Sequence, residues 1–154
     1  MKNKTMVIMA GISGAGKSTV AKRLFDGWKV IDCDELKKQC VGYDPKNPSL
    51  VHEESKRLEK LELTKAICGE ENFVYDTTAT NAERIVGLIK EAQSFGWTVE
   101  IVYVKVKLAT ALKRNASRER VVPEYIVREK NAVIAQSIEI ISSYADKIKV
   151  INND

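Results

Sequence analysis

The sequence predicts an α/β protein built on a parallel sheet of about five strands with helices on both faces. The first observation is that short apolar runs alternate with helical patterns along the whole chain, and strands separated by helices form parallel sheets. The second is a glycine-rich stretch, Gly11–Thr19, between the first strand pattern and the first helix pattern. The third is a composition with 44% hydrophobic and 30% charged residues, which is typical of a globular domain. We expect residues 1–154 to form a single domain.

The net charge, the cysteine count and the lengths of the apolar runs exclude several classes of protein. The net charge of +4 is mild and permits an anionic partner without requiring one. The three cysteines are odd in number and form no C-x-x-C pair, which argues against a disulfide framework or a zinc site. No apolar run is long enough for a signal peptide or a membrane span, so we expect a cytoplasmic protein with reduced thiols and no membrane partner.

The first half of the chain is expected to contain three strands and three helices. The apolar runs predict strands over residues 5–10, 28–32 and 72–76. Helices are expected over residues 19–25, 34–39 and about 49–68, with a proline-bearing loop over residues 42–48. In the long helix, Gly69 is suited to cap the C-terminus, and a helical spacing predicts a buried face made of Val51, Leu58, Leu61 and Cys68.

The second half continues the alternation. Thr80-x-x-Glu83 is a capping box that predicts a helix ending at Gly96, and its apolar face would hold Ile85, Leu88, Ile89, Ala92 and Phe95. The strongest strand pattern covers residues 98–106, followed by a short helix over 108–116 and a basic turn over 117–122. Pro123 suits the first turn of a final helix, whose apolar face is Ile126, Ile134, Ile138 and Ile141. Residues 148–151 predict a last strand.

The stretch Gly11–Thr19 fits G-x-x-x-x-G-K-[ST], the phosphate-binding loop of P-loop NTPases. Its glycines let the backbone curl so that successive N–H groups point at an anion. Lys17 is expected on the β- and γ-phosphates and the Ser18 hydroxyl on Mg²⁺. The residues expected to bind the nucleotide in this loop are Gly11, Ser13, Gly14, Ala15, Gly16, Lys17, Ser18 and Thr19. The fold class is therefore that of a P-loop NTPase.

Ligands bind such sheets at the carboxyl ends of the strands, so the loops that leave the strands are candidate active-site loops. The loop after the second strand carries Asp32, Asp34 and Lys37. A carboxylate there could accept the proton of an acceptor hydroxyl, and Lys37, three residues from Asp34, could bind an adjacent phosphate. Alternatively, Asp32 or Asp34 merely caps the short helix. The spacing leaves both interpretations open.

Two further loops are candidates. Asp76 and Thr77 end the third strand, where P-loop proteins often place an acidic residue near Mg²⁺; the alternative is a polar turn leading into the next helix. Arg114 and Arg118 lie four residues apart in a basic segment, where they would form a short lid over a transferring phosphoryl group. The alternative for these arginines is a solvated basic helix. We favour the lid because the high density of basic residues is confined to the place where a lid would lie.

These motifs together resemble the kinase domain of phage-type and bacterial 5′-hydroxyl polynucleotide kinases, which share a broad P-loop group with the zeta-toxin-like kinases. The resemblance covers nearly the whole chain. It rests on Gly11–Thr19, on Ile31–Lys37, on Asp76–Thr78 with Glu83 and Arg84, and most specifically on Leu112–Arg118 followed by Val122 and Pro123.

The resemblance implies an enzyme that uses ATP and Mg²⁺ to phosphorylate the 5′-hydroxyl of DNA or RNA. It makes Asp34 the general base, with Lys17 and Arg118 also catalytic. Arg114 and Arg118 would be lid residues on the ATP phosphates. On the acceptor side it implies Asp34, Lys37, Asp76, Thr77 and Arg84. Lys37 stands where the family has an arginine, so the charge is kept but the bidentate fork is lost.

Two other functions are compatible with the sequence. One is a small-molecule or nucleotide-sugar kinase of the zeta-toxin type. The other is a non-catalytic NTP-binding module, which the pairing of Asp34 with Lys37 disfavours because a switch needs no acceptor side. No phosphatase or ligase domain is expected in the 154 residues, so a nucleic-acid repair partner would be a separate protein.

Overall fold

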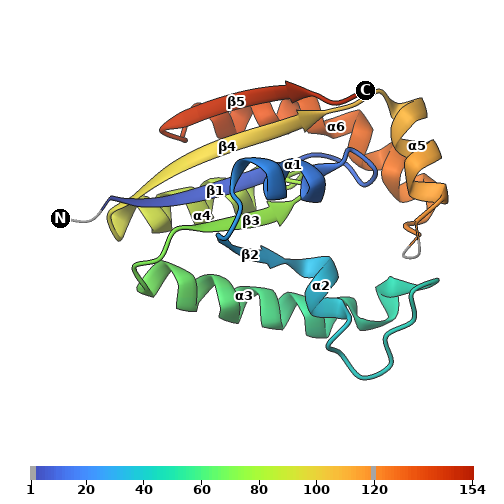
Figure 1. Ribbon diagram of the computed structural model, residues 1–154, viewed down its shortest axis with the longest axis horizontal. Coiled ribbons are helices and arrows are strands. Elements are labelled where there is room, and N and C mark those ends of the chain that lie inside the picture. The colour runs from blue at the N-terminus through green and yellow to red at the C-terminus, as the bar shows by residue number, and fades with distance from the viewer. Residues whose placement is uncertain (1–2, 119–120) are drawn as a thin grey trace.

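Five parallel strands form a single sheet in the order β2-β3-β1-β4-β5 (Figure 1). The computed structural model describes residues 3–118 and 121–154. The strands are β1 (Lys4–Ala10), β2 (Lys29–Asp32), β3 (Phe73–Thr77), β4 (Trp97–Lys105) and β5 (Lys147–Asn152). The predicted parallel sheet is confirmed, and each strand lies within one or two residues of its expected position.

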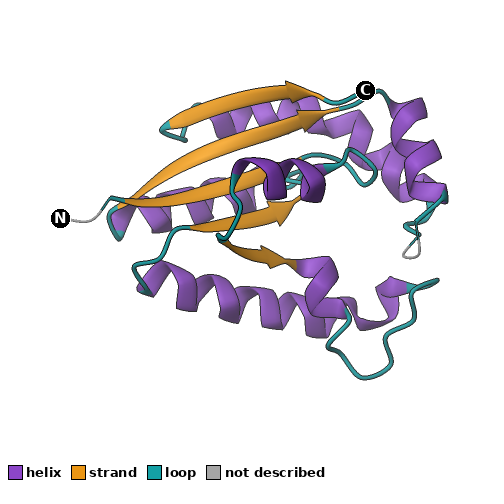
Figure 2. Ribbon diagram, in the orientation of Figure 1, coloured by secondary structure: helices purple, strands orange, loops and turns teal. Residues whose placement is uncertain are grey.

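Helices lie on both faces of this sheet, as predicted (Figure 2). They are α1 (Lys17–Leu24), α2 (Cys33–Lys37), α3 (His52–Cys68), α4 (Ala82–Ser94), α5 (Leu108–Ala116) and α6 (Glu124–Ser142), with a 3₁₀ turn, η1 (Pro48–Val51), before α3. Helix α1 covers one face, and α4 and α6 lie together behind the other, while α3 runs beside β2 (Figure 1). In the described part of the chain, no helix is both long and apolar enough to cross a membrane.

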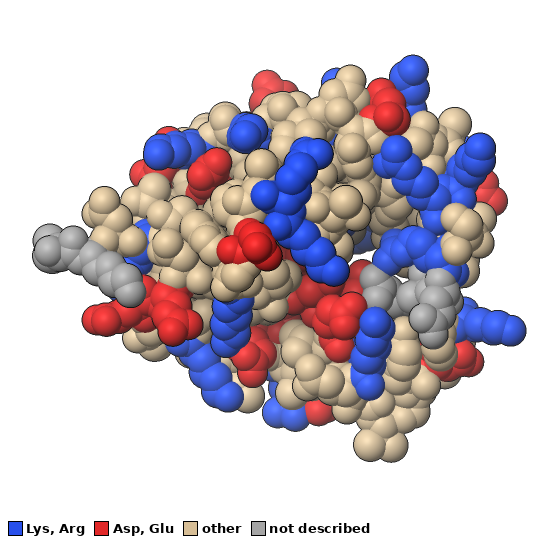
Figure 3. All heavy atoms as spheres, viewed as in Figure 1, with Lys and Arg blue, Asp and Glu red and all other residues tan. Residues whose placement is uncertain are grey.

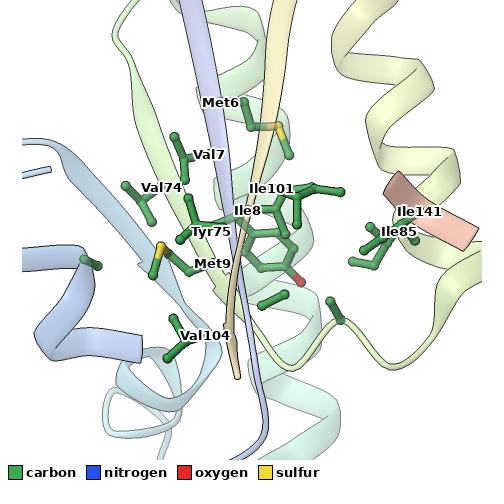
Figure 4. Packing of buried hydrophobic residues seen from close by; sticks show 14 of the residues in the cluster. Met6, Val7, Ile8, Met9, Val74, Tyr75, Ile85, Ile101, Val104 and Ile141 are labelled. Carbon is green, nitrogen blue, oxygen red and sulfur yellow. The ribbon is translucent and has the colours of Figure 1, made fainter. Parts of the chain in front are cut away.

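Strand β1 is the centre of the core. Residues Met6 to Ala10 are each 0% exposed, because neighbouring strands lie on both sides and helices on both faces. Figure 4 shows Val7 and Met9 pointing to one side of the sheet and Ile8 to the other, where Tyr75 lies. A strand buried on both faces needs apolar residues at every position, which explains the unbroken apolar run.

The sheet brings the polar ends of three strands to one edge. β1 ends at Ala10, directly before the glycine-rich loop, and Met9 pairs with Asp76 on β3. Asp76 in turn pairs with Asp32 at the end of β2. The chain leaves β1 toward β2 on one side and later crosses to β4 on the other. The carboxyl end of β1 is thus the topological switch point at which such sheets bind ligands.

The predicted buried face of the long helix is wrong except for Val51, which is 7% exposed and lies in η1 just before α3. Leu61 is 44% exposed and Cys68 is also exposed, whereas the buried residues of the helix are Ser55, Glu59, Leu63 and Ile67. Glu59 is buried because its carboxylate accepts a 2.7 Å hydrogen bond from the hydroxyl of Tyr75 on β3. A hydrophobic pattern cannot reveal a face that buries polar groups through such pairing.

Two other local predictions need correction. Helix α4 is capped by Asn81, whose side chain accepts from the Arg84 N–H, and not by Thr80, whose hydroxyl contacts Thr78. Phe95, expected on the apolar face of α4, is 52% exposed because it follows the last turn of the helix. Gly69 does cap α3, although its backbone is extended and not left-handed.

Candidate active site at the phosphate-binding loop

The loop between β1 and α1 has the curled backbone that its glycines predict. Gly14 and Gly16 adopt φ values of +89° and +92°, a left-handed region that other residues rarely enter. A Cβ atom on Gly14 would also lie 2.2 Å from the carbonyl oxygen of Ala111 on α5. The loop therefore needs glycine at position 14 both for its backbone conformation and for its close contact with α5.

Lys17, Ser18 and Asp76 form the polar floor of the site. The Lys17 ammonium donates to the Gly11 carbonyl oxygen at 2.7 Å and lies 3.7 Å from the Asp76 carboxylate. The Ser18 hydroxyl donates to the other Asp76 oxygen at 3.4 Å. The pairing of β1 with β3 produces this arrangement, because it places the end of β3 directly beside the loop.

Burial raises the pKa of the Asp76 carboxyl group above its usual range. Asp76 is only 7% exposed, and the negative charge of Asp34 adds to the effect. The Lys17 charge and the hydrogen bond from Ser18 act in the opposite direction without cancelling it. Ionised Asp76 therefore costs folding free energy, which is typical of a residue kept for binding or catalysis and not for stability.

Asp76→Asn is expected to stabilise the ligand-free protein at alkaline pH. Because the folded-state pKa of Asp76 is raised, its favourable contribution to stability is present at low pH and is lost as the pH rises through that pKa. At pH 8 the amide should raise the thermal unfolding midpoint by about 2–4 °C, the equivalent of roughly 1 kcal/mol in a domain of this size. The difference should shrink toward pH 4. Thermal melts without nucleotide and with EDTA measure it.

The exposed Asp26 provides the control for this measurement, since Asp26→Asn should leave the midpoint unchanged at both pH values. A lower midpoint for Asp76→Asn at pH 8 would contradict the prediction. It would mean that attraction between Lys17 and Asp76 outweighs the cost of burial.

The two acidic residues at the start of α2 have different positions. The Asp32 carboxylate accepts a 2.9 Å hydrogen bond from the backbone N–H of Asp34 and so caps the helix. Asp34 lies in the first turn and lines the cleft above the loop. Capping therefore explains Asp32 and does not explain Asp34, whose role toward an acceptor hydroxyl stays a prediction.

Arg114 and Arg118 lie across the cleft from Asp34. Arg114, in the last turn of α5, has its Nη1 atom 3.5 Å from the Gly14 carbonyl oxygen and 3.4 Å from that of Ala15. Arg118 follows the helix end and also lines the cleft. The predicted basic turn 117–122 includes residues 119 and 120, which lie outside the described residues.

The side chain of Asn115 binds the backbone of Val122, a structural role that the sequence did not reveal. Its buried amide donates to the Val122 carbonyl oxygen at 2.7 Å and accepts from the Val122 N–H at 3.2 Å. This pair of hydrogen bonds joins the last turn of α5 to the segment that precedes α6. The resemblance included Asn115 in its motif, but nothing in the local pattern distinguished a structural amide from an exposed one.

The cleft has a volume of about 220 Å³. Acidic side chains gather at the centre of this face, over the start of α2, and basic side chains lie on α5 across the hollow (Figure 3). Most of the predicted site residues meet here. The lining residues are Ile12, Ser13, Gly14, Gly16, Lys17, Ser18, Thr19, Asp32, Asp34, Asp76, Arg114 and Arg118.

Three residues predicted on the acceptor side, Lys37, Thr77 and Arg84, are not among those that line the cleft. The Thr77 hydroxyl accepts from the Ala79 N–H at 3.3 Å. The Arg84 guanidinium donates to the Tyr75 hydroxyl at 2.8 Å and lies 3.5 Å from the Glu59 carboxylate. These contacts give Thr77 and Arg84 structural partners, and substrate roles for all three residues stay predictions.

The thiol of Cys33, next to Asp34, is partly buried. Burial raises the pKa of its thiol to about 11, so the group is protonated at neutral pH. Its sulfur lies 3.6 Å from the Ser55 hydroxyl on α3. Cys33, Cys40 and Cys68 are free cysteines in the structure.

The residues around Ser18 fit a magnesium ion held mainly by a nucleotide. Mg²⁺ prefers oxygen ligands and usually keeps several waters, with one or two protein groups and substrate phosphates completing its shell. The Ser18 hydroxyl and the Asp76 carboxylate provide such oxygens side by side. Within residues 3–118 and 121–154, no cluster of three or more His, Cys, Asp or Glu is arranged to hold a metal by itself.

The loop after the central strand, with a lysine and a hydroxyl directed at one cleft, places this chain among the P-loop NTPase-type domains. Residues 6–139 match the model of a protein family described as an AAA domain, and the chain belongs to that family. A comparison with curated protein sequences finds no match.

Several solved structures share the fold. A chain of the AvrRxo1-ORF1:AvrRxo1-ORF2 complex with sulphate ions is 18% identical, with a TM-score of 0.77 over 92% of this chain and 51% of that one. A chain of the PezAT toxin-antitoxin system of Streptococcus pneumoniae is 16% identical, with a TM-score of 0.68 over 100% of this chain and 70% of that one. A chain of the Pnkp1/Rnl/Hen1 RNA repair complex is 15% identical, with a TM-score of 0.71 over 90% of this chain and 46% of that one. This chain thus spans about half the length of the first and third of these relatives.

Proposed function

We propose that the protein is a kinase that uses ATP and Mg²⁺ to phosphorylate the 5′-hydroxyl of a polynucleotide. The observation that carries the proposal is the position of Asp34. Its carboxylate lines the same cleft as Lys17 and Ser18, and Asp32 has taken the capping role that would otherwise explain it. A nucleotide switch has no need of a second carboxylate facing the phosphates.

Each group in the cleft then has a chemical role. The loop N–H groups and Lys17 bind the β- and γ-phosphates, and Ser18 supplies a ligand to Mg²⁺, which neutralises phosphate charge when bound. Asp34 accepts the proton of the attacking hydroxyl and holds that hydroxyl in line with the leaving oxygen. Arg114 and Arg118 stabilise the charge on the transferring group from the opposite side.

The remaining predicted residues belong to the acceptor side in this proposal. Lys37 lies at the end of α2, one turn from Asp34, where its ammonium could bind a phosphate adjacent to the reacting hydroxyl. Asp76 and Thr77 end β3, and Arg84 lies in the first turn of α4, the next helix along the chain. The similarity in fold to a chain of an RNA repair complex agrees with a nucleic-acid acceptor.

A small-molecule or nucleotide-sugar acceptor is the second candidate, and one observation favours it. Acidic side chains gather over the start of α2, beside the cleft (Figure 3). A polyanionic strand is repelled by such a surface, whereas a neutral sugar is not.

One experiment separates these acceptors. The protein is incubated with Mg²⁺ and γ-labelled ATP in the presence of 5′-hydroxyl DNA, 5′-hydroxyl RNA, nucleosides or sugar nucleotides. We expect label on a 5′-hydroxyl oligonucleotide and none on the same oligonucleotide made with a 5′-phosphate. Label on a sugar nucleotide alone would support the second candidate. ATP binding without transfer to any acceptor would point instead to a non-catalytic module.

A further inference from the structure

We propose that Asn153 is a positioning residue for the phosphate-binding loop, and that its side-chain amide sets the affinity of the loop for polyphosphate. The inference rests on the proposed function in that the loop must bind nucleotide phosphates. Asn153 lies just beyond β5, at the opposite end of the sequence from the loop. It is not among the residues that line the cleft.

The contact between Asn153 and the loop is short and direct. The Asn153 Nδ2 atom donates to the Ala15 carbonyl oxygen at 2.7 Å. Arg114 approaches the same oxygen only to 3.4 Å, so Asn153 is the stronger of these two donors. Ala15 is 0% exposed, and a buried carbonyl without a partner is costly, which makes this hydrogen bond important for the loop geometry.

Peptide geometry carries the effect from the carbonyl to the binding surface. In a trans peptide the C=O and the N–H point in opposite directions. The carbonyl of Ala15 and the N–H of Gly16 belong to one peptide plane, so a donor that holds the carbonyl also fixes the direction of that N–H. Loop N–H groups are the donors that bind phosphate. Asn153 therefore orients a phosphate-binding group without touching the phosphate.

Asn153 is itself held in place, as a positioning residue must be. Its backbone N–H donates to the Lys105 carbonyl oxygen at the end of β4 at 2.8 Å. The neighbouring Asp154 carboxylate accepts from the backbone N–H of Lys107, the residue that precedes α5. The amide thus reaches the loop from a segment fixed to the sheet.

Gly16 of the phosphate-binding loop packs closely against the Asn153 amide. A Cβ atom added to Gly16 would lie 2.5 Å from the Asn153 Nδ2 atom. Glycine at position 16 therefore serves two purposes: it permits the left-handed backbone and it leaves room for the amide. A positioning residue for the loop requires such close packing.

Asn153→Ala tests the proposal, with Asn152→Ala as a matched control on the exposed end of β5. Dissociation constants are measured by calorimetry for ATP, GTP and inorganic tripolyphosphate, each with Mg²⁺. Loss of the hydrogen bond should weaken binding by about 5- to 30-fold for all three ligands alike. The control should bind all three as the native protein does. The thermal unfolding midpoint of each ligand-free variant is measured in parallel to show that the fold persists.

The proposal is tested by comparing how the dissociation constants of ATP, GTP and tripolyphosphate change in Asn153→Ala. A loss for ATP that tripolyphosphate does not share would overturn the proposal, because it would make Asn153 a contact for the base or the ribose. Equal affinities for Asn153→Ala and the native protein would also overturn it, while leaving the proposed function intact. Failure of the native protein to bind any polyphosphate would instead overturn the proposed function, and with it the role of Asn153.

Discussion

Asp34→Asn is expected to lower the rate of phosphoryl transfer by about 10²–10⁴-fold, the usual contribution of a positioned general base. The amide keeps the shape of the side chain but cannot take the proton of the acceptor hydroxyl. ATP affinity should change by less than about two-fold, because the base acts on the acceptor in the transition state and not on the bound nucleotide. Single-turnover transfer from labelled ATP and a separate measurement of ATP binding check the two parts.

Glu35 offers a matched control for this prediction. It neighbours Asp34 on α2, but its side chain is 60% exposed and pairs with Lys38. Glu35→Gln removes the same charge from the same helix and should leave transfer unchanged. If Asp34→Asn transfers phosphate at the native rate, Asp34 is not the base, and the acidic lining of the cleft then needs another explanation.

Arg118→Ala should have an effect at least as large, about 10³–10⁵-fold on the transfer step if the side chain acts as an arginine finger. Because the finger stabilises charge that develops in the transition state, kcat should fall far more than ATP affinity. Arg118→Lys keeps the charge but loses the planar fork, so its rate should lie between those of the native protein and the alanine variant.

Lys113→Ala is the control for the arginine. Lys113 lies on the exposed side of α5, five residues before Arg118, and its removal changes the net charge equally. It should transfer phosphate as the native protein does. Equal losses for the two variants would show that only the general positive charge of this region matters, and that no finger is present.

The inner strands of the sheet could be predicted because they are largely buried. Unbroken apolar runs such as Met6–Ala10 have few alternatives in a chain of this length, and the glycine-rich loop fixed the order of strand, loop and helix. The position of the cleft followed from the sheet, since parallel strands present their carboxyl ends at one edge. Asp34, Asp76 and Arg114 could therefore be expected around one phosphate site.

The errors arose where polar groups are buried through partners distant in sequence. Glu59 reads as a surface residue of α3 until Tyr75, 16 residues later, is seen to donate to it. Thr80 and Asn81 are both good caps, and only the path of the chain out of β3 decides between them. The contact of Asn153 with the phosphate-binding loop could not be predicted from the sequence, because a single asparagine after a strand is typical of any loop.

The contact between Asn153 and Ala15 also has a consequence for biosynthesis. The two residues are 138 positions apart, so the ribosome makes the phosphate-binding loop among the first parts of the domain and Asn153 among the last. Chains emerge N-terminus first, and a contact of such high sequence separation forms late in folding. If Asn153 has the proposed role, a nascent chain that lacks β5 carries the complete phosphate-binding motif without one of the hydrogen bonds that orient it. Full affinity for nucleotide is then expected only once the far edge of the sheet is in place, so it would report completion of the sheet and would not guide the early steps of folding.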